Sequence, residues 1–186
     1  MKNYLLLIML LVFTGCAHNV AFKSPDIYKH EKVLPVKMAF YMDSSVKSKV
    51  YSERSFMSGI ANRWDVPIGS VVHEYGVAYL QAGVAEFKEI QAPDEGDSYD
   101  LVVTITDIVF NMSGQAAHCD LTVDIKDRIG NPEVKKYHAD GPSGLGRVLA
   151  AGAFAQKSAI RQSTHVVMEN IYKSLMGDLR KRQQGF

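Results

Sequence analysis

Two neighbouring stretches, residues 99–110 and 117–126, constrain the fold of this chain more than any other feature. The first is dense in Val, Ile, Thr and Leu, which suit the pleated surface of a β-sheet. In the second, every other residue is apolar, namely Cys119, Leu121, Val123 and Ile125. Such alternation predicts an antiparallel strand with one buried and one solvated face. The chain is therefore expected to build a sheet that is covered on one side only.

Further strands are expected before and after this pair. Their apolar patterns cover residues 33–42, 87–91 and 133–139. The last of them is expected to return from residues 117–126 through a hairpin turn at 127–132.

Two helices complete the predicted fold. The first begins near Pro67, which suits a first-turn position, and small residues such as Gly76 would let it lie close on the sheet. The second runs from about residue 149 to 181 and carries one apolar stripe. The element order is β-α-β-β-β-β-α, and the predicted class is α+β. We expect a one-sided, mainly antiparallel sheet of about four to five strands with two helices packed on one face.

Two segments show no clear periodic pattern of apolar residues. Residues 17–32 are polar, contain Pro25 and are expected to form a tether. Residues 43–62 are rich in Ser and Lys and are expected to form an irregular excursion after the first strand.

The N-terminus has the form of a bacterial secretory signal. Lys2 precedes an apolar run over residues 4–13, and the small residue Gly15 stands before Cys16. The run is about half as long as the roughly 20 apolar residues that a membrane-spanning helix needs. A buried core helix is disfavoured because residues 17–32 turn polar at once. An ordinary secretory peptide cleaved elsewhere remains an alternative, and it would leave Cys16 as an unmodified thiol.

Residues 12–16, Val-Phe-Thr-Gly-Cys, resemble the lipobox of bacterial lipoproteins, although Phe13 stands where Leu is usual. The resemblance implies cleavage before Cys16 and acylation of its thiol and its new amino group. Ala17 and His18 follow in place of Asp. By the sorting rule known for Gram-negative lipoproteins, this implies the periplasmic face of the outer membrane. One acyl chain binds a bilayer only marginally, whereas several make the attachment lasting.

The expected organisation follows from this cleavage. Residues 1–15 form a signal peptide that is removed, residues 16–32 carry the lipidated Cys16 and the tether, and residues 33–186 form a single periplasmic α+β domain.

Charge and cysteine content exclude some partners. The chain has 21 Lys and Arg against 20 Asp and Glu, and loss of Lys2 with the signal would leave it formally neutral. A neutral chain argues against nucleic acid or a polybasic membrane patch as the main partner. Cys119 is the only cysteine besides Cys16. Because it lies in an alternating apolar pattern, it is expected to be a small core residue and not a reactive thiol.

No catalytic motif is complete. Residues 141–148 superficially match a phosphate-binding loop, but that loop needs Lys and then Ser or Thr where Arg147 and Val148 stand. Ser143 lacks the Gly-x-Ser-x-Gly elbow of hydrolases. We therefore expect a protein that is not an enzyme and that carries no cofactor.

The six histidines do not show the spacing of a zinc site. His118 and Asp120 are two apart and so share one face of a strand, and His138 would approach them through the hairpin. We expect no metal site.

Four aromatic residues gather around the excursion after the first strand: Tyr41, Tyr51, Phe56 and Trp64. Exposed aromatics in a loop mark a surface for a partner or a glycan. The alternative, which we prefer, is that Trp64 and Phe56 pin the loop onto the domain.

A lipidated cysteine, a short tether, this order of strands and helices and an amphipathic last helix resemble outer-membrane accessory lipoproteins. These include the lipopolysaccharide-transport plug, the exopolysaccharide-export ring lipoprotein and curli-type secretion lipoproteins. The resemblance lies in architecture, carried by residues 33–42, 99–110 and 127–130, and architecture alone does not give function.

A strong anchor joined to a domain with no recognisable active site predicts a non-catalytic, lipid-anchored subunit of an envelope assembly, transport or secretion complex. It would act by tethering and by docking to an envelope protein, with a homo-oligomer as one form. The alternatives are a module that binds envelope glycan or lipid, and a hydrolase that acts on wall or glycan.

Overall fold

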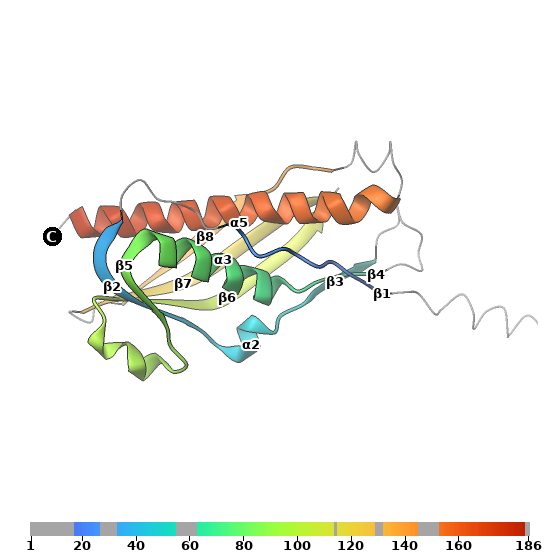
Figure 1. Cartoon of the computed structure of the whole chain (residues 1–186). Helices are drawn as coiled ribbons and strands as arrows, with labels where there is room; N and C mark the ends of the chain where they lie inside the picture. Colours follow the sequence, from blue (N-terminus) through green and yellow to red (C-terminus); the bar gives the residue numbers. More distant parts are fainter. Residues whose placement is uncertain are drawn as a thin grey trace, which may run out of the picture.

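The structure is a computed structural model that describes residues 17–26, 33–54, 63–113, 115–128, 132–144 and 153–184. These residues form an α+β fold in which two main helices pack against sheets (Figure 1). The predicted class is confirmed.

The main sheet has the strand order β5-β2-β6-β7-β8. The strands are β2 (Leu34–Met42), β5 (Val84–Glu89), β6 (Leu101–Ser113), β7 (Ala116–Asp127) and β8 (Pro132–Asp140). The predicted element order is confirmed, because a helix follows β2 and another follows β8. The pairing is more mixed than expected: β2 runs parallel to both β5 and β6, whereas β6, β7 and β8 are antiparallel. Two crossover connections after β2 permit the parallel pairs, since a tight hairpin cannot join parallel strands.

Helices α3 (Ile68–Gly83) and α5 (Ala153–Gln184) cover one face of this sheet. The alternating apolar residues of β7, including Cys119 and Leu121, are buried on that face. Gly76 allows α3 to lie close: a Cβ built there would be 2.9 Å from both Phe40 Cζ and Tyr172 Oη. This agrees with the small residues predicted in the first helix.

The opposite face of the main sheet is solvated except at one corner. There a short 3-10 helix, η2 (Pro93–Ser98), covers a small apolar cluster of Ala39, Ile90 and Val102. Tyr41 and Tyr99 pack at its margin.

A second sheet corrects the expectation for the two segments without a clear period. It has the order β1-β4-β3 and comprises β1 (Ala17–Asn19), β3 (Tyr51–Arg54) and β4 (Arg63–Val66). A short helix, α2 (Ser44–Lys47), precedes β3. These strands could not be predicted because three or four residues show too little alternation of apolar and polar side chains to be recognised. In addition, β1 pairs with a strand that is far from it in the sequence.

The second sheet is attached where β2 stops pairing with β6. Beyond Ile105, the edge of β6 receives side chains in place of a strand. Lys49 Nζ lies 2.5 Å from Asp107 Oδ1 and donates to the carbonyl oxygen of Ile108 at 3.3 Å. The hydroxyl of Tyr51 accepts from the backbone N–H of Met112 at 3.1 Å. These contacts satisfy backbone groups that the end of β2 would otherwise leave without partners.

No helix in the described part of the chain has both the length and the apolar character that crossing a membrane requires.

Candidate functional site

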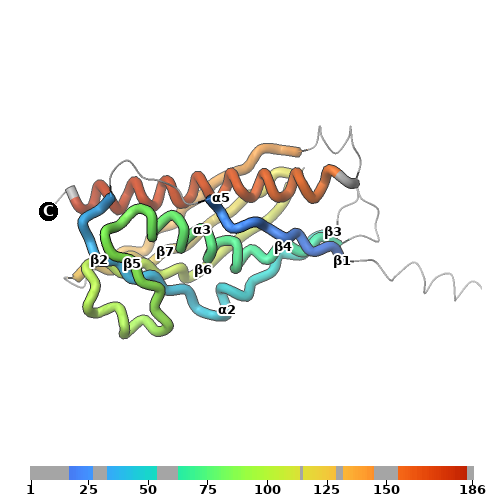
Figure 2. The backbone as a smooth tube through the Cα atoms, viewed as in Figure 1, coloured from blue at the N-terminus to red at the C-terminus, as the bar shows by residue number. Residues whose placement is uncertain are grey.

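Residues 17–26, which we call the N-terminal strap, lie against the domain (Figure 2). Here the structure departs from the expected tether. The side chain of Val20 is fully buried, and its backbone N–H donates to the carbonyl oxygen of Asp65 at 2.9 Å. The ring of His18 stacks on Trp64 with 5.0 Å between centroids. The strap is therefore a structural element of the fold.

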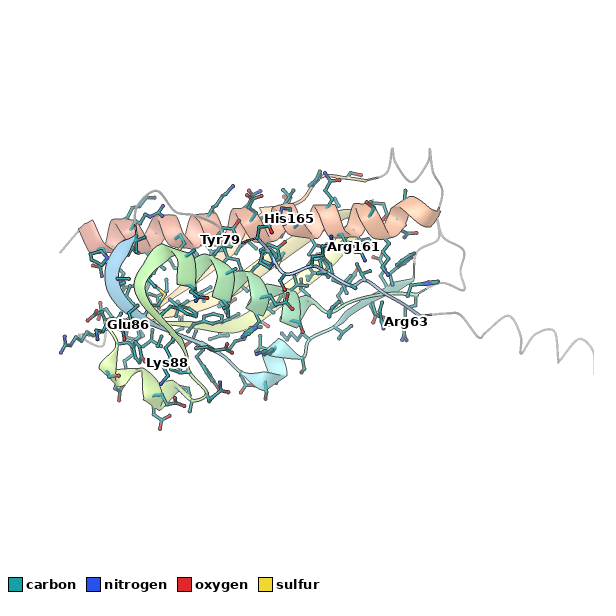
Figure 3. All side chains as sticks on the ribbon, viewed as in Figure 1. Arg63, Tyr79, Glu86, Lys88, Arg161 and His165 are labelled. Carbon is teal, nitrogen blue, oxygen red and sulfur yellow. The ribbon has the colours of Figure 1, made fainter. Side chains whose placement is uncertain are left out.

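An open groove of about 420 Å³ runs between the strap, α3 and α5. Its volume falls within the range of about 300–1,000 Å³ that is usual for ligand pockets. Phe22 and Tyr75 give it an aromatic wall, and Lys23 and Arg161 bring two cationic side chains. Figure 3 places Arg161 on α5, close to the strap.

A hydrogen bond between Tyr75 and His165 connects α3 to α5 at the wall of the groove. The hydroxyl of Tyr75 lies 2.5 Å from His165 Nδ1. Burial, with the nearby carboxylates of Glu169 and Glu74, raises the pKa of Tyr75 to about 12. The phenol is therefore protonated at neutral pH and shares a hydrogen bond with Nδ1, while the other ring nitrogen lies 3.9 Å from Glu169 Oε2.

The groove is lined by two cationic side chains, Lys23 and Arg161, while the carboxylates of Glu74 and Glu169 lie near Tyr75 at its wall. Among the residues described, no carboxylate lies within ion-pair distance of Lys23 or Arg161. Two cations beside an aromatic wall can accept the anionic end of a partly apolar ligand.

A histidine and aspartate cluster lies on the solvated face of β7 and β8, where the sequence predicted that His118, Asp120 and His138 approach one another. His118 Nδ1 lies 2.5 Å from Asp140 Oδ1, and His138 Nδ1 lies 2.7 Å from Asp120 Oδ1. Hydrogen bonds to Asp120 and Asp140 raise the pKa of His138, and those from His118 and His138 lower that of Asp140. Within the described ranges, no group of three such residues has a geometry that could hold a metal ion.

A second polar cluster joins α2, α3 and β5. His73 Nε2 lies 2.7 Å from Glu89 Oε1, and Lys47 Nζ lies 3.4 Å from the same oxygen. Burial would raise the pKa of Glu89, but hydrogen bonds and charges from His73 and Lys47 outweigh it and lower that pKa. In the described part of the chain, His73 has no hydroxyl or thiol partner that could act as a nucleophile. The cluster connects three elements and forms no catalytic triad there.

The predicted partner-binding aromatics occupy different places. Trp64 is buried at 8% exposure, and Tyr51 packs against the same main core. Tyr51 also donates to Glu53 at 2.8 Å, whereas Tyr41 belongs to the small cluster on the other face of the sheet. Phe56 lies outside the described residues. The packing of Trp64 agrees with the alternative that it pins its segment to the domain.

The remaining sequence features give little chemistry. Cys119 is 1% exposed, and burial raises the pKa of its thiol to about 12, as expected of a core residue. Of the glycine-rich stretch, residues 141–144 are described and Ser143 is exposed. Residues 145–152 and Cys16 lie outside the described ranges.

The strap and its groove were missed by the sequence reasoning. One signal was available: Val20 and Phe22 are large apolar residues two apart in a segment whose other residues are small or polar. A pattern of two residues is too short to predict a strand.

Comparisons with known proteins give a structural similarity but no match in sequence. No family model and no curated protein matches this chain. A crystal structure of a minor lipoprotein from Acinetobacter baumannii is similar, with a TM-score of 0.47 and 11% sequence identity. The match covers 81% of this chain and 95% of that one.

Proposed function

We propose that this protein is a lipid-anchored, non-catalytic subunit of an envelope assembly, transport or secretion complex. It attaches through acylated Cys16 to the periplasmic face of the outer membrane and acts by docking to a partner protein. The observation that carries the proposal is the pairing of β1 with β4, from Ala17 opposite Arg63 onward. An anchor one residue before this strand is mechanically coupled to the whole domain.

The outer edge of β8 is the docking surface that we favour. In the described part of the chain β8 ends the main sheet, so one side of its backbone is unpaired over nine residues. Val134 on this strand is 66% exposed. An unpaired edge accepts an extended segment of another protein through backbone hydrogen bonds. The opposite edge strand, β5, also carries charged side chains, among them Glu86 and Lys88 (Figure 3), but it spans six residues against the nine of β8 and so offers a shorter edge.

Photocrosslinking in cells tests the docking surface. A crosslinker at Val134 should capture a specific protein, or a second copy of this chain, whereas one at Val109 on the neighbouring solvated face should capture less. Equal capture at the two positions would contradict docking at β8. Palmitate incorporation should be lost in Cys16→Ser, and labelling that survived this change would contradict the anchor.

The groove favours a second candidate function, binding of an anionic lipid or glycan. Lys23 and Arg161 supply positive charge beside Phe22 and Tyr75. Native mass spectrometry of the purified protein should then detect an added ligand, and Arg161→Gln should reduce its occupancy. Lys157→Gln is the matched control, because Lys157 lies one turn away on α5 and does not line the groove. Equal occupancy in the two variants, or a bare protein mass, would contradict this function.

A further inference from the structure

We infer that the membrane-facing surface of this protein is the end built by the second sheet, and that the strap leaves no free tether between the lipid and the domain. The partner of this surface is a phospholipid bilayer. The inference rests on the proposed acylation of Cys16, and the experiment below separates the failure of one from the failure of the other.

Covalent geometry sets the spacing between anchor and sheet. Ala17, the first residue of β1, is already paired with Arg63. Consecutive Cα atoms across a trans peptide are about 3.8 Å apart, so lipid on residue 16 begins one residue from the sheet. Residues 17–32 as a free tether would instead reach roughly 50 Å when extended. The two arrangements therefore differ by up to about 5 nm in the height of the domain above the bilayer.

Several independent contacts keep the strap in place. Three successive residues of β1 pair with β4, and the next residue, Val20, is fully buried. Phe22 packs against the main core, and the hydroxyl of Ser24 donates to Glu74 Oε2 at 3.4 Å. Release of the strap would expose Val20 to water and remove the ring that stacks on Trp64.

Because the fold is elongated, anchoring at one end determines which surface faces the membrane. Figure 1 shows the second sheet at one end of an elongated molecule, near the start of α5, with the C-terminal end of α5 at the other. A helix of 32 residues such as α5 is about 48 Å long. Anchoring at the second sheet thus places Arg63 next to the lipid headgroups and leaves the opposite end free to project into the periplasm (Figure 3).

Trp64 is a built-in reporter for this geometry. It is the single tryptophan of the chain and contacts His18, two residues beyond Cys16. The purified acylated protein is reconstituted in vesicles of phosphatidylethanolamine and phosphatidylglycerol that contain dansyl-labelled headgroups. Energy transfer from Trp64 to dansyl should be efficient, because the strap holds this indole close to the lipid attachment point.

Two variants separate the strap from a tether. Insertion of sixteen Gly and Ser residues between Cys16 and Ala17 adds a mean length of about 22 Å. It should leave the Trp64 emission spectrum unchanged and lower transfer by roughly half or more. Val20→Asp should displace the strap, shift the emission to the red and also lower transfer. Val109→Asp is the control, since this valine is 53% exposed on β6, away from the strap and from the β8 edge, and should change neither signal.

The outcomes are distinct. Protein that pellets with vesicles and loses transfer on linker insertion supports the inference. Protein that pellets but transfers equally with and without the linker overturns the inference alone. Protein that fails to pellet, while its Trp64 emission is that of a buried indole, overturns the proposed anchor and the inference with it.

Discussion

Gly76 offers a direct test of how closely α3 lies on the sheet and on α5. In a helix interior, Gly→Ala normally stabilises by about 1 kcal/mol. At Gly76 the added methyl group would lie 2.9 Å from Phe40 Cζ and 2.9 Å from Tyr172 Oη. Both rings are fully buried, and the Tyr172 hydroxyl donates to the carbonyl oxygen of Val72 at 2.6 Å.

Because both rings are fully buried, overpacking should outweigh the gain in helix propensity. Overpacking of a dense core costs about 1–3 kcal/mol, and two contacts with buried rings place Gly76→Ala in the upper part of that range. After the gain in helix propensity, the expected net loss in the free energy of unfolding is about 1–2 kcal/mol.

Gly177 in α5 is the matched control. A Cβ built at this position has no neighbour within 4 Å. Gly177→Ala should therefore show the propensity gain alone, a stabilisation of about 1 kcal/mol. The same chemical change in two helices is thus expected to have opposite signs.

A double-mutant cycle identifies the crowded atom. Tyr172→Phe alone should cost about 1 kcal/mol for the lost hydrogen bond. When Tyr172→Phe is combined with Gly76→Ala, the contact with Oη is absent. The double variant should therefore lose about 0.5–1 kcal/mol less unfolding free energy than the sum of the losses in the two single variants. Urea unfolding followed by circular dichroism measures all four proteins. Stabilisation by Gly76→Ala, or strict additivity in the cycle, would refute the close packing of α3.

Three further changes are expected to have measurable effects. The pKa of His138 is raised above its ordinary 6.5, so protonated His138 stabilises the fold fully below pH 6.5, and this stabilisation is lost as the pH rises through the raised pKa. His138→Gln should flatten that part of the plot of unfolding free energy against pH, and an unchanged slope would contradict the pairing with Asp120. Buried Cys119, with its thiol pKa raised to about 12, should react with a thiol reagent only after unfolding, and rapid reaction of the native protein would be the contrary result. The backbone N–H of Ala117 donates to Ser163 Oγ at 2.8 Å, and Ser163→Ala removes this acceptor. The change should lower the free energy of unfolding, measured by denaturant titration, by about 1–3 kcal/mol, whereas no change would indicate a replacement acceptor.

The main elements were predictable because their patterns are local. Alternation in residues 117–126 predicted β7, and the apolar stripe before residue 181 predicted α5, since each pattern repeats over many residues. The parallel pairing of β2 was not predicted, because strand direction depends on which neighbour a strand finds after a crossover.

The candidate site was predictable only in part. The strand spacing of His118 and Asp120, with the hairpin partner His138, correctly indicated the cluster on the outer face. The groove was not predictable, because Lys23 and Arg161 come from opposite ends of the chain and carry no mutual pattern.

The sequence by itself determined the α+β class, the order of the main strands and helices, and a signal that points to lipid on Cys16. These depend on residues close to one another in the chain, where periodicity and short motifs act. Only the tertiary structure decided that the residues after Cys16 join a second sheet, that Val20 is buried there, and that Trp64 lies beneath His18. The physical reason is that a three-residue strand has no stability of its own and exists only where distant residues supply both its hydrogen bonds and its apolar cover.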